Sequence, residues 1–438
     1  MSAPIDLRLL PATAAVSPDG RLAIGGCDLG DLASRFGTPV FVYDESHLRS
    51  RCREYVAAFG ADRVAYAGKA FLCRAMVRLV AEEGLHLDVA TGGELHVALS
   101  AGFPPARIVF HGNNKSDEEL AAALAAGVGR IVADSSAELD RLEALVKAGH
   151  ATPRVMLRVT PGVEAHTHEY IETGTEDSKF GFPVRPGDAV EAARRVAASP
   201  HLELAGLHCH IGSQIHVLQS YAAAVAIVVG LAAEVERAAG PGAVAELNLG
   251  GGLGIAYHDG DEPPTVAEYA GVLHRALDEA LAEAGLASRP ALLVEPGRSI
   301  AATAGVTLYR VGTIKEIAGV RTYVAVDGGI SDNARPAMYG ARYEAFLPER
   351  VDADRPLVAT VAGKHCEQGD LLVRNATLPA DLAVGDLLCT PATGAYGYSM
   401  ASNYNKVPRP AVVFAQDGNA RLVVRRETLD DLLRLEEM

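Results

Sequence analysis

The sequence predicts a (β/α)8 barrel of the TIM type joined to a second, antiparallel β domain. From residue 63 to residue 294, short apolar runs alternate with alanine- and leucine-rich stretches of helical periodicity. Eight strand candidates separated by helices are typical of one (β/α)8 unit. After Ile300 the apolar and polar residues alternate within short runs, and Gly, Asp, Asn or Pro separates one run from the next. This pattern indicates an antiparallel β domain or barrel. A doubly wound sheet is the alternative, but the first strand candidate lacks the phosphate-binding glycine turn of that fold.

The individual elements follow from these patterns in chain order. The N-terminal part holds strand candidates 21–24 and 39–43, then a helix expected from about Ser46 to Gly60. Barrel strands are expected at 63–67, 86–90, 107–110, 130–133, 154–159, 202–209, 246–249 and 291–294. Barrel helices are expected at 72–83, 93–101, 116–126, 136–148, 187–198, 218–239 and 265–285. Strands of the second domain are expected at 305–317, 321–326, 357–361, 371–374, 386–389, 411–414 and 420–425.

The domain boundaries follow from the change of pattern. We expect the barrel to span residues 45–303 and the β domain to combine residues 1–44 with 304–438. The N-terminal strands have no partner inside a (β/α)8 unit, so they are expected to pair with the later β domain.

Composition and charge exclude several classes of partner. The 438 residues are 49% hydrophobic and 22% charged, which is a soluble globular composition. The net charge of −15, without a basic block, argues against a nucleic acid or an anionic membrane. The N-terminus lacks a signal peptide and the apolar run 221–233 is too short to span a bilayer, so we expect a cytoplasmic protein. The six cysteines form no Cys-x-x-Cys pair and are not a disulfide framework.

Residues whose side chains could take part in catalysis or ligand binding stand where the predicted barrel strands end. They are Lys69, Asp88, His111, Arg158, His210, the run Gly250–Gly252 and Glu295. A (β/α)8 barrel gathers the carboxyl ends of its strands into one mouth, where its active site lies. The sequence therefore predicts one site that contains these groups.

Lys69 is the central candidate. Its neighbours Gly68, Ala70 and Phe71 are small or apolar. Desolvation among them would lower the pKa of the amine and free it to form an imine with an aldehyde. The alternative is a solvated surface lysine.

The glycine run that follows the seventh strand candidate suits a phosphate. Its backbone can approach an anion closely and donate amide hydrogens to it. The run is not a dinucleotide fingerprint, because Ile255 stands where the third glycine is required. A flexible turn is the alternative, although phosphate sites are frequent after the last two strands of this barrel.

Glu295 and two His-x-His pairs leave alternatives open. Glu295 could form a salt bridge with Arg298, or accept from the protonated ring nitrogen of a pyridoxal-phosphate cofactor. His208 with His210, and His166 with His168, could be zinc ligands of a hydrolase, but no third-ligand and water-activating set is identifiable. We favour an imidazole that packs on a ring or contacts a substrate, and expect no metal.

Several motifs in one order resemble a known family. They are Tyr-Ala-Gly-Lys-Ala at 66–70, His-Cys-His-Ile-Gly-Ser-Gln at 208–214, Leu-Gly-Gly-Gly-Leu-Gly at 249–254, Glu-Pro-Gly-Arg at 295–298 and Cys-Glu-Gln-Gly-Asp at 366–370. Together they are similar to the meso-diaminopimelate decarboxylases. These are pyridoxal 5'-phosphate enzymes in which an alanine-racemase-like barrel is joined to a β domain.

The resemblance implies roles by motif. Lys69 would hold the cofactor covalently, His210 would stack on its ring, and Glu295 would pair with its ring nitrogen. The other cofactor contacts would come from Asp88, Ser213, Gly250, Gly251, Gly252, Gly297, Arg298 and Tyr396, with Glu94 near the lysine. The substrate would be bound by Arg298, Arg335, Tyr339, Glu367 and Tyr396. Cys366 would donate a proton from a loop that reaches the neighbouring subunit, so a homodimer with shared active sites is expected.

The implied reaction is decarboxylation of meso-2,6-diaminopimelate to L-lysine and CO2, the last step of lysine biosynthesis. Phe71, Thr160 and Lys364-His365 depart from the family pattern but leave the catalytic set intact. A decarboxylase of ornithine or arginine is an alternative, disfavoured by two arginines suited to a distal carboxylate. A non-catalytic cofactor carrier is disfavoured by the β domain, and a racemase by Glu295.

Overall fold

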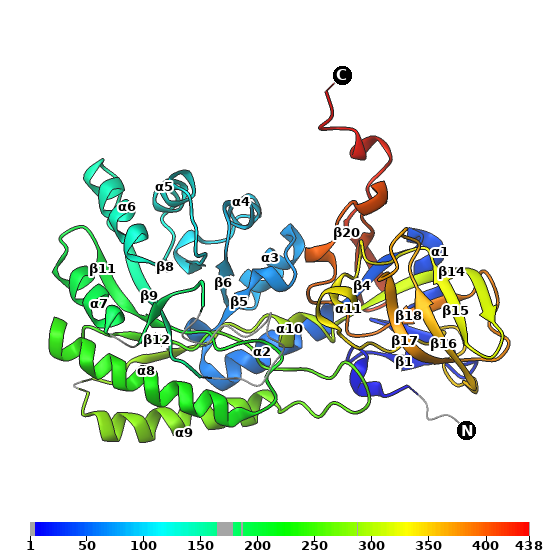
Figure 1. The fold of residues 1–438 in the computed structure, drawn as a ribbon, viewed down its shortest axis with the longest axis horizontal. Helices are drawn as coiled ribbons and strands as arrows, with labels where there is room; N and C mark the ends of the chain where they lie inside the picture. The colour runs from blue at the N-terminus through cyan, green and yellow to red at the C-terminus, as the bar shows by residue number, and fades with distance from the viewer. Residues whose placement is uncertain (1–4, 164–177, 185–186, 287, 438) are drawn as a thin grey trace. The chain divides into compact units, whose positions relative to one another are not determined.

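The computed structural model describes residues 5–163, 178–184, 187–286 and 288–437 and divides into two compact units (Figure 1). The barrel unit comprises residues 52–254 and 263–297. The second unit comprises residues 1–51, 255–262 and 298–438.

Eight parallel strands form the barrel. In sheet order they are β13 (Ala291–Leu293), β12 (Glu246–Asn248), β11 (Glu203–His208), β9 (Arg154–Thr160), β8 (Arg130–Ala133), β7 (Ile108–Phe110), β6 (His86–Val89) and β5 (Ala65–Ala67). A parallel bridge between Val64 and Val294 joins the first strand to the last. The strand β10 (Phe182–Pro183) pairs with β9. The predicted barrel strands are confirmed, and each predicted end lies within two residues of the observed one.

Helices follow the strands, as the apolar periodicity predicted. They are α3 (Arg74–Glu82), α4 (Gly92–Ser100), α5 (Asp117–Ala126), α6 (Ser136–Lys147), α7 (Asp188–Ala198), α8 (Leu218–Ala239) and α9 (Val266–Ala284). Their starts are encoded locally: Ser116 with Glu119, and Thr265 with Glu268, form reciprocal capping boxes before α5 and α9. Gly127 and Gly285 end the same two helices in the left-handed conformation.

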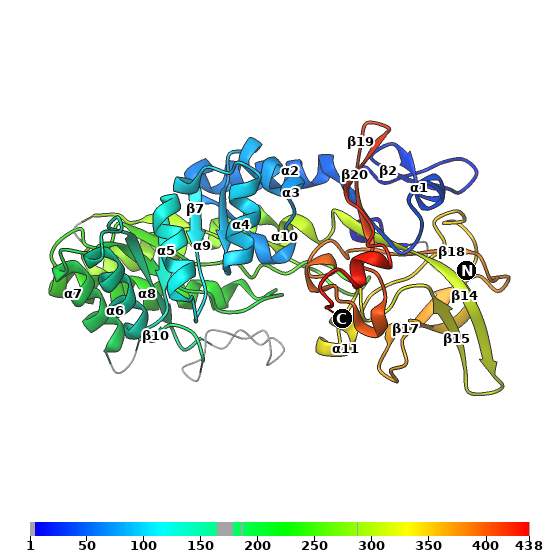
Figure 2. The ribbon, with the colours of Figure 1, turned by 90° about the horizontal axis from the view of Figure 1, so that it is seen from above.

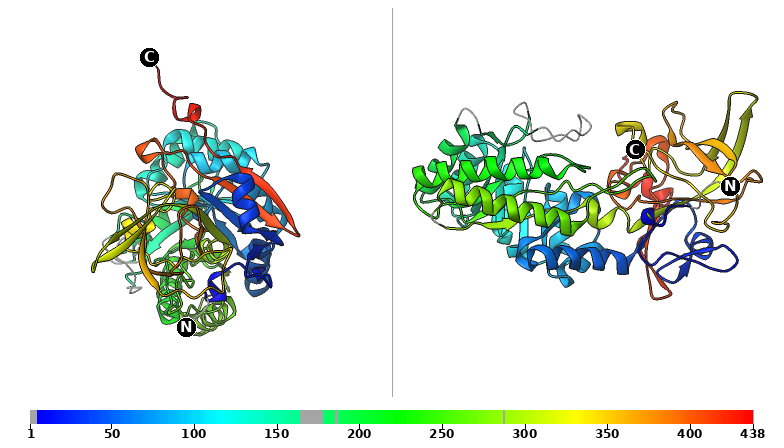
Figure 3. Two further views of the ribbon diagram at one scale, coloured as in Figure 1. Left: turned by 90° about the vertical axis from the view of Figure 1, so that its right-hand side faces the viewer. Right: turned by 90° about the horizontal axis from the view of Figure 1, so that it is seen from below.

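The helix α8 is the one helix, among the described residues, that is long and apolar enough to cross a membrane. In its most apolar window 56% is buried inside the protein. It lies against α9, as the two views of Figure 3 show, and against α7. A helix that packs on the core of a soluble protein can be as long and as apolar as a membrane-spanning helix, and we assign α8 to that class.

A mixed sheet forms the main part of the second unit. Its order is β17 (Leu371–Leu378), β16 (Leu357–Ala362), β15 (Arg321–Val326), β14 (Gly305–Ile317), β4 (Val40–Asp44), β19 (Ala411–Gln416) and β20 (Asn419–Val424). The strand β18 (Leu387–Thr390) also pairs with β14, and β14 and β15 form a long hairpin (Figure 2). Most ladders are antiparallel, as predicted, but β15 with β16 and β4 with β19 are parallel.

The N-terminal segment divides between two sheets. β4 lies between β14 and β19, which confirms that residues 39–43 join the later β strands. Residues 21–24 do not join that sheet as expected: they form β2 (Leu22–Ile24), which pairs with β1 (Ala15–Val16) and β3 (Cys27–Asp28). The helix predicted at 46–60 is α2 (Glu45–Phe59). The short helix α1 (Leu29–Phe36), capped by Asp28, was not predicted.

Candidate active site

The carboxyl ends of the barrel strands bring most of the predicted groups together. Glu295, two residues after the end of β13, is 5% exposed and forms the centre of a buried network. Its Oε1 accepts from His111 Nε2 at 2.8 Å and from Asn248 Nδ2 at 2.7 Å. Its Oε2 lies 3.1 Å from His208 Nε2. These partners come from the ends of β7, β12 and β11, so closure of the barrel assembles the network.

Electrostatics keep Glu295 ionised. Burial raises the pKa of this carboxyl, but its electrostatic interactions and hydrogen bonds with His111 and His208 hold it well below its usual value. Burial lowers the pKa of His111, and Glu295 and Asp88 more than offset this, so that the pKa is raised. Burial lowers the pKa of His208 to about 4. The two imidazoles, whose ring centroids lie 4.7 Å apart, therefore flank one carboxylate: the raised pKa of His111 favours its charged form, whereas His208 is neutral.

Asp88, in β6, shares this network. It is buried, its Oδ1 lies 3.8 Å from His111 Nε2, and burial raises its pKa to about 7. Glu94 in the first turn of α4 accepts a hydrogen bond from the Ala90 amide at 2.7 Å, and burial raises its pKa. The charge of Lys69 offsets part of this increase in the pKa of both carboxyls. The lysine therefore lies in the field of the strand-end carboxylates.

The exposure of Lys69 corrects one expectation. Gly68, Ala70 and Phe71 are buried, as their small or apolar character predicted, but the side chain of Lys69 itself is exposed. It stands in the short 3-10 turn Gly68–Ala70, directly after β5. Protein atoms do not supply the expected desolvation, and the amine is accessible to a ligand.

His210 is held as a neutral imidazole. The backbone amide of Gly251 donates to its Nδ1 at 3.2 Å, so that nitrogen carries no hydrogen. Burial lowers the pKa of His210 well below its usual value, and the charges of Lys69 and Arg158 lower it further. The Glu295 carboxylate acts in the opposite direction and raises the pKa of this ring, but burial outweighs it.

The glycine run Gly250–Gly252 requires glycine for steric reasons. Gly250 and Gly252 have φ values of +66° and +111°. A Cβ on Gly251 would lie 2.2 Å from the Glu295 carbonyl oxygen. The loop that carries Ser213 is joined to this run, since the Ile215 amide donates to the Gly252 carbonyl at 2.9 Å. A Cβ on Gly297 would lie 2.9 Å from that of Ala67. Closely approaching backbone is a property of phosphate-binding loops.

The remaining predicted residues belong to the second unit, where two arginines lie among tyrosines. Arg298 and Arg335 are both 6% exposed. Arg298 Nη1 donates to the Tyr257 hydroxyl at 2.6 Å, and its guanidinium lies 4.8 Å from the ring centroid of Tyr396. Arg335 donates to the Tyr343 hydroxyl, and its guanidinium lies 4.5 Å from the Tyr257 centroid. One aromatic ring therefore contacts both cations.

Arg335 and Tyr339 begin and end α11 (Arg335–Tyr339). Residues four apart lie on one helical face, so the two predicted substrate contacts share a side of this helix. No carboxylate lies within ion-pair distance of Arg335 among the residues that the structure describes. A buried guanidinium without a carboxylate is a ready site for an anionic ligand.

Cys366 and Glu367 occupy the turn between β16 and β17, and both are exposed. The other five cysteines are buried, which agrees with their predicted role as small apolar residues. The Cys366 amide donates to Asn405 Oδ1 at 3.2 Å. The candidate proton donor therefore lies on a surface turn whose backbone is tied to another segment.

Several residues around the site were missed by sequence reasoning. Those that contact a predicted site residue are Asn248, Tyr257 and Tyr343. His111 was noted at a strand end, and His208 in a His-x-His pair, but nothing in the local pattern placed them on Glu295. His166 and His168 of the second His-x-His pair lie outside the described residues.

His111, His208 and Glu295 also have the spacing of a metal site, with ligand atoms within 4.8 Å of one another. A metal ligand must be a neutral imidazole, whereas the raised pKa of His111 favours its charged form beside the carboxylate. We therefore interpret the three residues as a hydrogen-bonded charge network.

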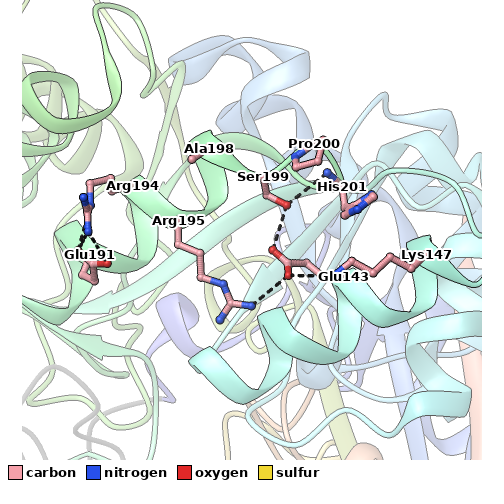
Figure 4. A pocket seen from close by; sticks show the side chains of 9 residues that line it. All are labelled: Glu143, Lys147, Glu191, Arg194, Arg195, Ala198, Ser199, Pro200 and His201. Carbon is pink, nitrogen blue, oxygen red and sulfur yellow. Dashed lines mark hydrogen bonds and ion pairs between the residues drawn. The ribbon is translucent and has the colours of Figure 1, made fainter.

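A separate surface depression lies at the opposite end of the barrel strands. It has a volume of about 490 Å³ and is lined by residues from α6, α7 and the loop before β11 (Figure 4). Its charged groups already pair with one another: Arg194 binds Glu191 at 2.8 Å and Arg195 binds Glu143 at 3.3 Å. None of the predicted site residues lines it.

Comparison with known proteins places the chain in a family. Residues 45–302 match the family model described as the pyridoxal-binding domain of pyridoxal-dependent decarboxylases, which defines the class of enzyme. The diaminopimelate decarboxylase of Mycobacterium tuberculosis strain ATCC 25618 / H37Rv is 52% identical over 425 residues, which cover 95% of each chain. That of Bacillus subtilis strain 168 is 48% identical over 432 residues, 98% of each chain. The chain belongs to the diaminopimelate decarboxylase family.

The fold agrees with this assignment. The crystal structure of diaminopimelate decarboxylase from M. jannaschii in complex with L-lysine aligns with a TM-score of 0.90 and 34% identity, and the alignment covers 98% of each chain. The predicted combination of a (β/α)8 barrel with a second β domain is confirmed.

The donor set of the barrel fits a pyridoxal group. Lys69 offers an exposed primary amine for the aldehyde, and Glu295 offers an anionic carboxylate. Oε1 of Glu295 already accepts two hydrogen bonds, but Oε2 accepts one and keeps a further acceptor position for a protonated ring nitrogen. His210 supplies a flat, neutral ring, and the glycine run supplies close backbone amides.

Proposed function

We propose that the chain decarboxylates meso-2,6-diaminopimelate to L-lysine and CO2, the last step of lysine biosynthesis. The family assignment supports this reaction, as does the L-lysine bound in the relative from M. jannaschii. The observation that carries the choice of substrate is the pair of buried guanidiniums, Arg298 and Arg335, framed by tyrosines. Diaminopimelate has a carboxylate at its distal end, whereas ornithine and arginine have none.

Pyridoxal 5'-phosphate is the proposed cofactor, and the barrel residues would hold it. When bound, it supplies an electron sink for the electron pair left on the α carbon when the carboxylate departs. Lys69 would hold its aldehyde carbon, and His210 would cover one face of its ring. The phosphate would be bound by Ser213, the run Gly250–Gly252 and the backbone around Gly297.

The main contribution of the barrel network would be to hold protons on particular atoms of the cofactor and of Lys69. Glu295, kept ionised by His111 and His208, would hold the proton on the ring nitrogen. Asp88 and Glu94 would surround the Lys69 amine, and Asp88, whose pKa burial raises to about 7, would exchange protons with it near neutral pH. These groups therefore set where protons lie before the carboxylate leaves.

The second unit would supply substrate recognition. Arg298 and Arg335, with Tyr339 and Tyr396, would bind the distal carboxylate, and Glu367 would accept from the distal amine. Cys366 would protonate the α carbon.

The assembly and compartment remain part of the proposal. We propose a homodimer in which the Cys366–Glu367 turn of one subunit completes the site of the other, and a cytoplasmic location. We also retain residues 45–303 as the cofactor-binding domain and residues 1–44 with 304–438 as the β domain.

The test is carbon dioxide release from candidate amino acids by the pure enzyme and by Arg335→Ala. The parent should prefer meso-diaminopimelate to ornithine, arginine and lysine. A hydrogen bond to a charged group contributes about 1.5–3 kcal/mol, so Arg335→Ala should raise KM for meso-diaminopimelate about 10- to 200-fold. The KM for an amino acid without a distal carboxylate should not rise.

Arg342→Ala is the matched control, because Arg342 is an exposed arginine seven residues further along the chain. Its KM should stay within about twofold of the parent value. A parent enzyme that released carbon dioxide faster from ornithine or arginine than from meso-diaminopimelate would refute the proposed substrate.

Mixing two inactive variants tests the shared site. In an equal mixture of Lys69→Ala and Cys366→Ala after subunit exchange, about half of the dimers are mixed, and each mixed dimer has one site with both native residues. We expect about a quarter of the parent activity to return. A mixture of Lys69→Ala with Glu295→Gln is the control, because these residues belong to one barrel and no native site forms. Equal inactivity of both mixtures would contradict sharing between subunits.

A further inference from the structure

The turn that carries Cys366 contains a buried imidazole, that of His365. It is 8% exposed, whereas its neighbours Lys364, Cys366 and Glu367 are exposed. His365 is also one of the departures from the family pattern, and the proposed reaction gives it no role. A buried imidazole in an exposed turn is held by specific contacts, because an unsatisfied polar ring there would cost free energy.

Both ring nitrogens of His365 have partners. Nε2 lies 2.8 Å from the Ser331 hydroxyl, and Nδ1 lies 3.2 Å from Asn405 Oδ1. The same Asn405 oxygen accepts from the Cys366 amide at 3.2 Å. The backbone amide of His365 donates to Asp370 Oδ2 at 2.8 Å, which ties the two ends of the turn together. The imidazole therefore connects the turn to two other segments.

These contacts determine the tautomer of the neutral ring. A backbone amide can only donate, so the Asn405 atom that faces Cys366 must be the carbonyl oxygen. That oxygen cannot donate to His365, so Nδ1 carries the hydrogen and Nε2 accepts from the Ser331 hydroxyl. Asn405 has φ = +51°, a left-handed conformation that asparagine adopts more readily than most residues. Its side chain is thus held between the imidazole and the Cys366 amide.

We infer that His365 is a positioning residue that holds Asn405 Oδ1 against the Cys366 amide and so fixes the turn presenting the thiol and the Glu367 carboxylate. The inference rests on the proposed function, in which the S–H bond of Cys366 breaks as a C–H bond forms at the α carbon. The thiolate then regains a proton from solvent. Because proton transfer requires close alignment, a loose turn slows this step more than it weakens binding.

The experiment compares His365→Leu with His365→Asn in the full-length holoenzyme. Leucine fills the buried site without a donor, whereas the asparagine amide keeps a donor near the Nδ1 position. For His365→Leu we expect hydrogen exchange at the Cys366 amide to accelerate about tenfold or more, and kcat to fall roughly 10- to 100-fold with KM within about threefold. For His365→Asn we expect exchange and kcat within about threefold of the parent values.

Two further variants keep the test decisive. Asn405→Gly removes the shared oxygen at an exposed position whose φ suits glycine, and it must accelerate exchange at Cys366 as His365→Leu does. Lys364→Ala, an exposed neighbour in the same turn, should change neither readout. Unchanged exchange in His365→Leu and Asn405→Gly, or an equal loss in His365→Asn and His365→Leu, would overturn the inference. Exchange at Cys366 does not depend on turnover, so a parent that failed to decarboxylate meso-diaminopimelate would refute the proposed function alone.

Discussion

Replacing Lys69 by alanine should abolish turnover, with kcat lowered roughly 10³-fold or more. Lys69 is the lysine at the mouth of the barrel that acts on Asp88, Glu94 and His210, and its exposed amine is accessible to an aldehyde. Because the side chain is exposed, the substitution should change the free energy of unfolding by less than about 0.5 kcal/mol. Carbon dioxide release measures the activity, and urea denaturation measures the stability.

Lys147→Ala is the matched control for this substitution. Lys147 is an exposed lysine at the end of α6 and lies 3.9 Å from Glu143. It is at the end of the barrel opposite the strand-end network, so its loss should leave kcat within about twofold of the parent. Retention of more than about a tenth of the parent kcat in Lys69→Ala would exclude covalent holding by this amine.

Replacing Glu295 by glutamine should affect both activity and stability. The substitution removes the carboxylate that raises the pKa of buried His111, and breaking a buried ion pair in this way costs up to about 3–5 kcal/mol. Without an anionic partner for the ring nitrogen, kcat should fall on the order of 10²-fold or more. The two effects are measured by urea denaturation and by carbon dioxide release.

The pH dependence of stability provides a second readout of the same substitution. The pKa of His111 is raised in the folded protein, so its stabilising contribution is complete below pH 6.5, the unfolded value, and is lost as pH rises through the folded pKa. The pKa of Asp88 is raised to about 7, so its protonated carboxyl stabilises the fold fully below about pH 4, and this contribution is also lost as the pH rises toward 7. In Glu295→Gln the part of this loss of stability that is due to His111, which begins near pH 6.5, should disappear.

Glu246→Gln separates stability from catalysis. Glu246 is another buried carboxylate of the barrel, at the opposite end of β12, where Arg130 binds it at 2.6 Å and Arg154 at 3.3 Å. Its loss should destabilise the fold by a comparable amount while kcat stays within about threefold of the parent. If Glu295→Gln and Glu246→Gln lowered kcat equally, Glu295 would have a structural role alone.

The alternation of strands and helices was determined by the sequence. Capping boxes at Ser116 and Thr265 define helix starts from groups only three residues apart. The barrel strands were predicted to within one or two residues of each end, and the barrel order follows from the general rule for parallel strands joined by helices. The strand-end position of Lys69 and Glu295 followed from the same local pattern. Such features depend on conformational propensities that act over a few residues, so they can be predicted from the local sequence pattern.

The tertiary structure decided which groups meet. His111 lies 184 residues from Glu295 in sequence and His208 lies 87 residues from it, yet both contact its carboxylate because the barrel closes between β5 and β13. The exposure of Lys69, the small sheet formed by β2, and the tyrosines that frame Arg298 and Arg335 likewise depend on long-range packing. Local sequence patterns do not predict such contacts, because each contact forms only when segments that are distant along the chain are buried together.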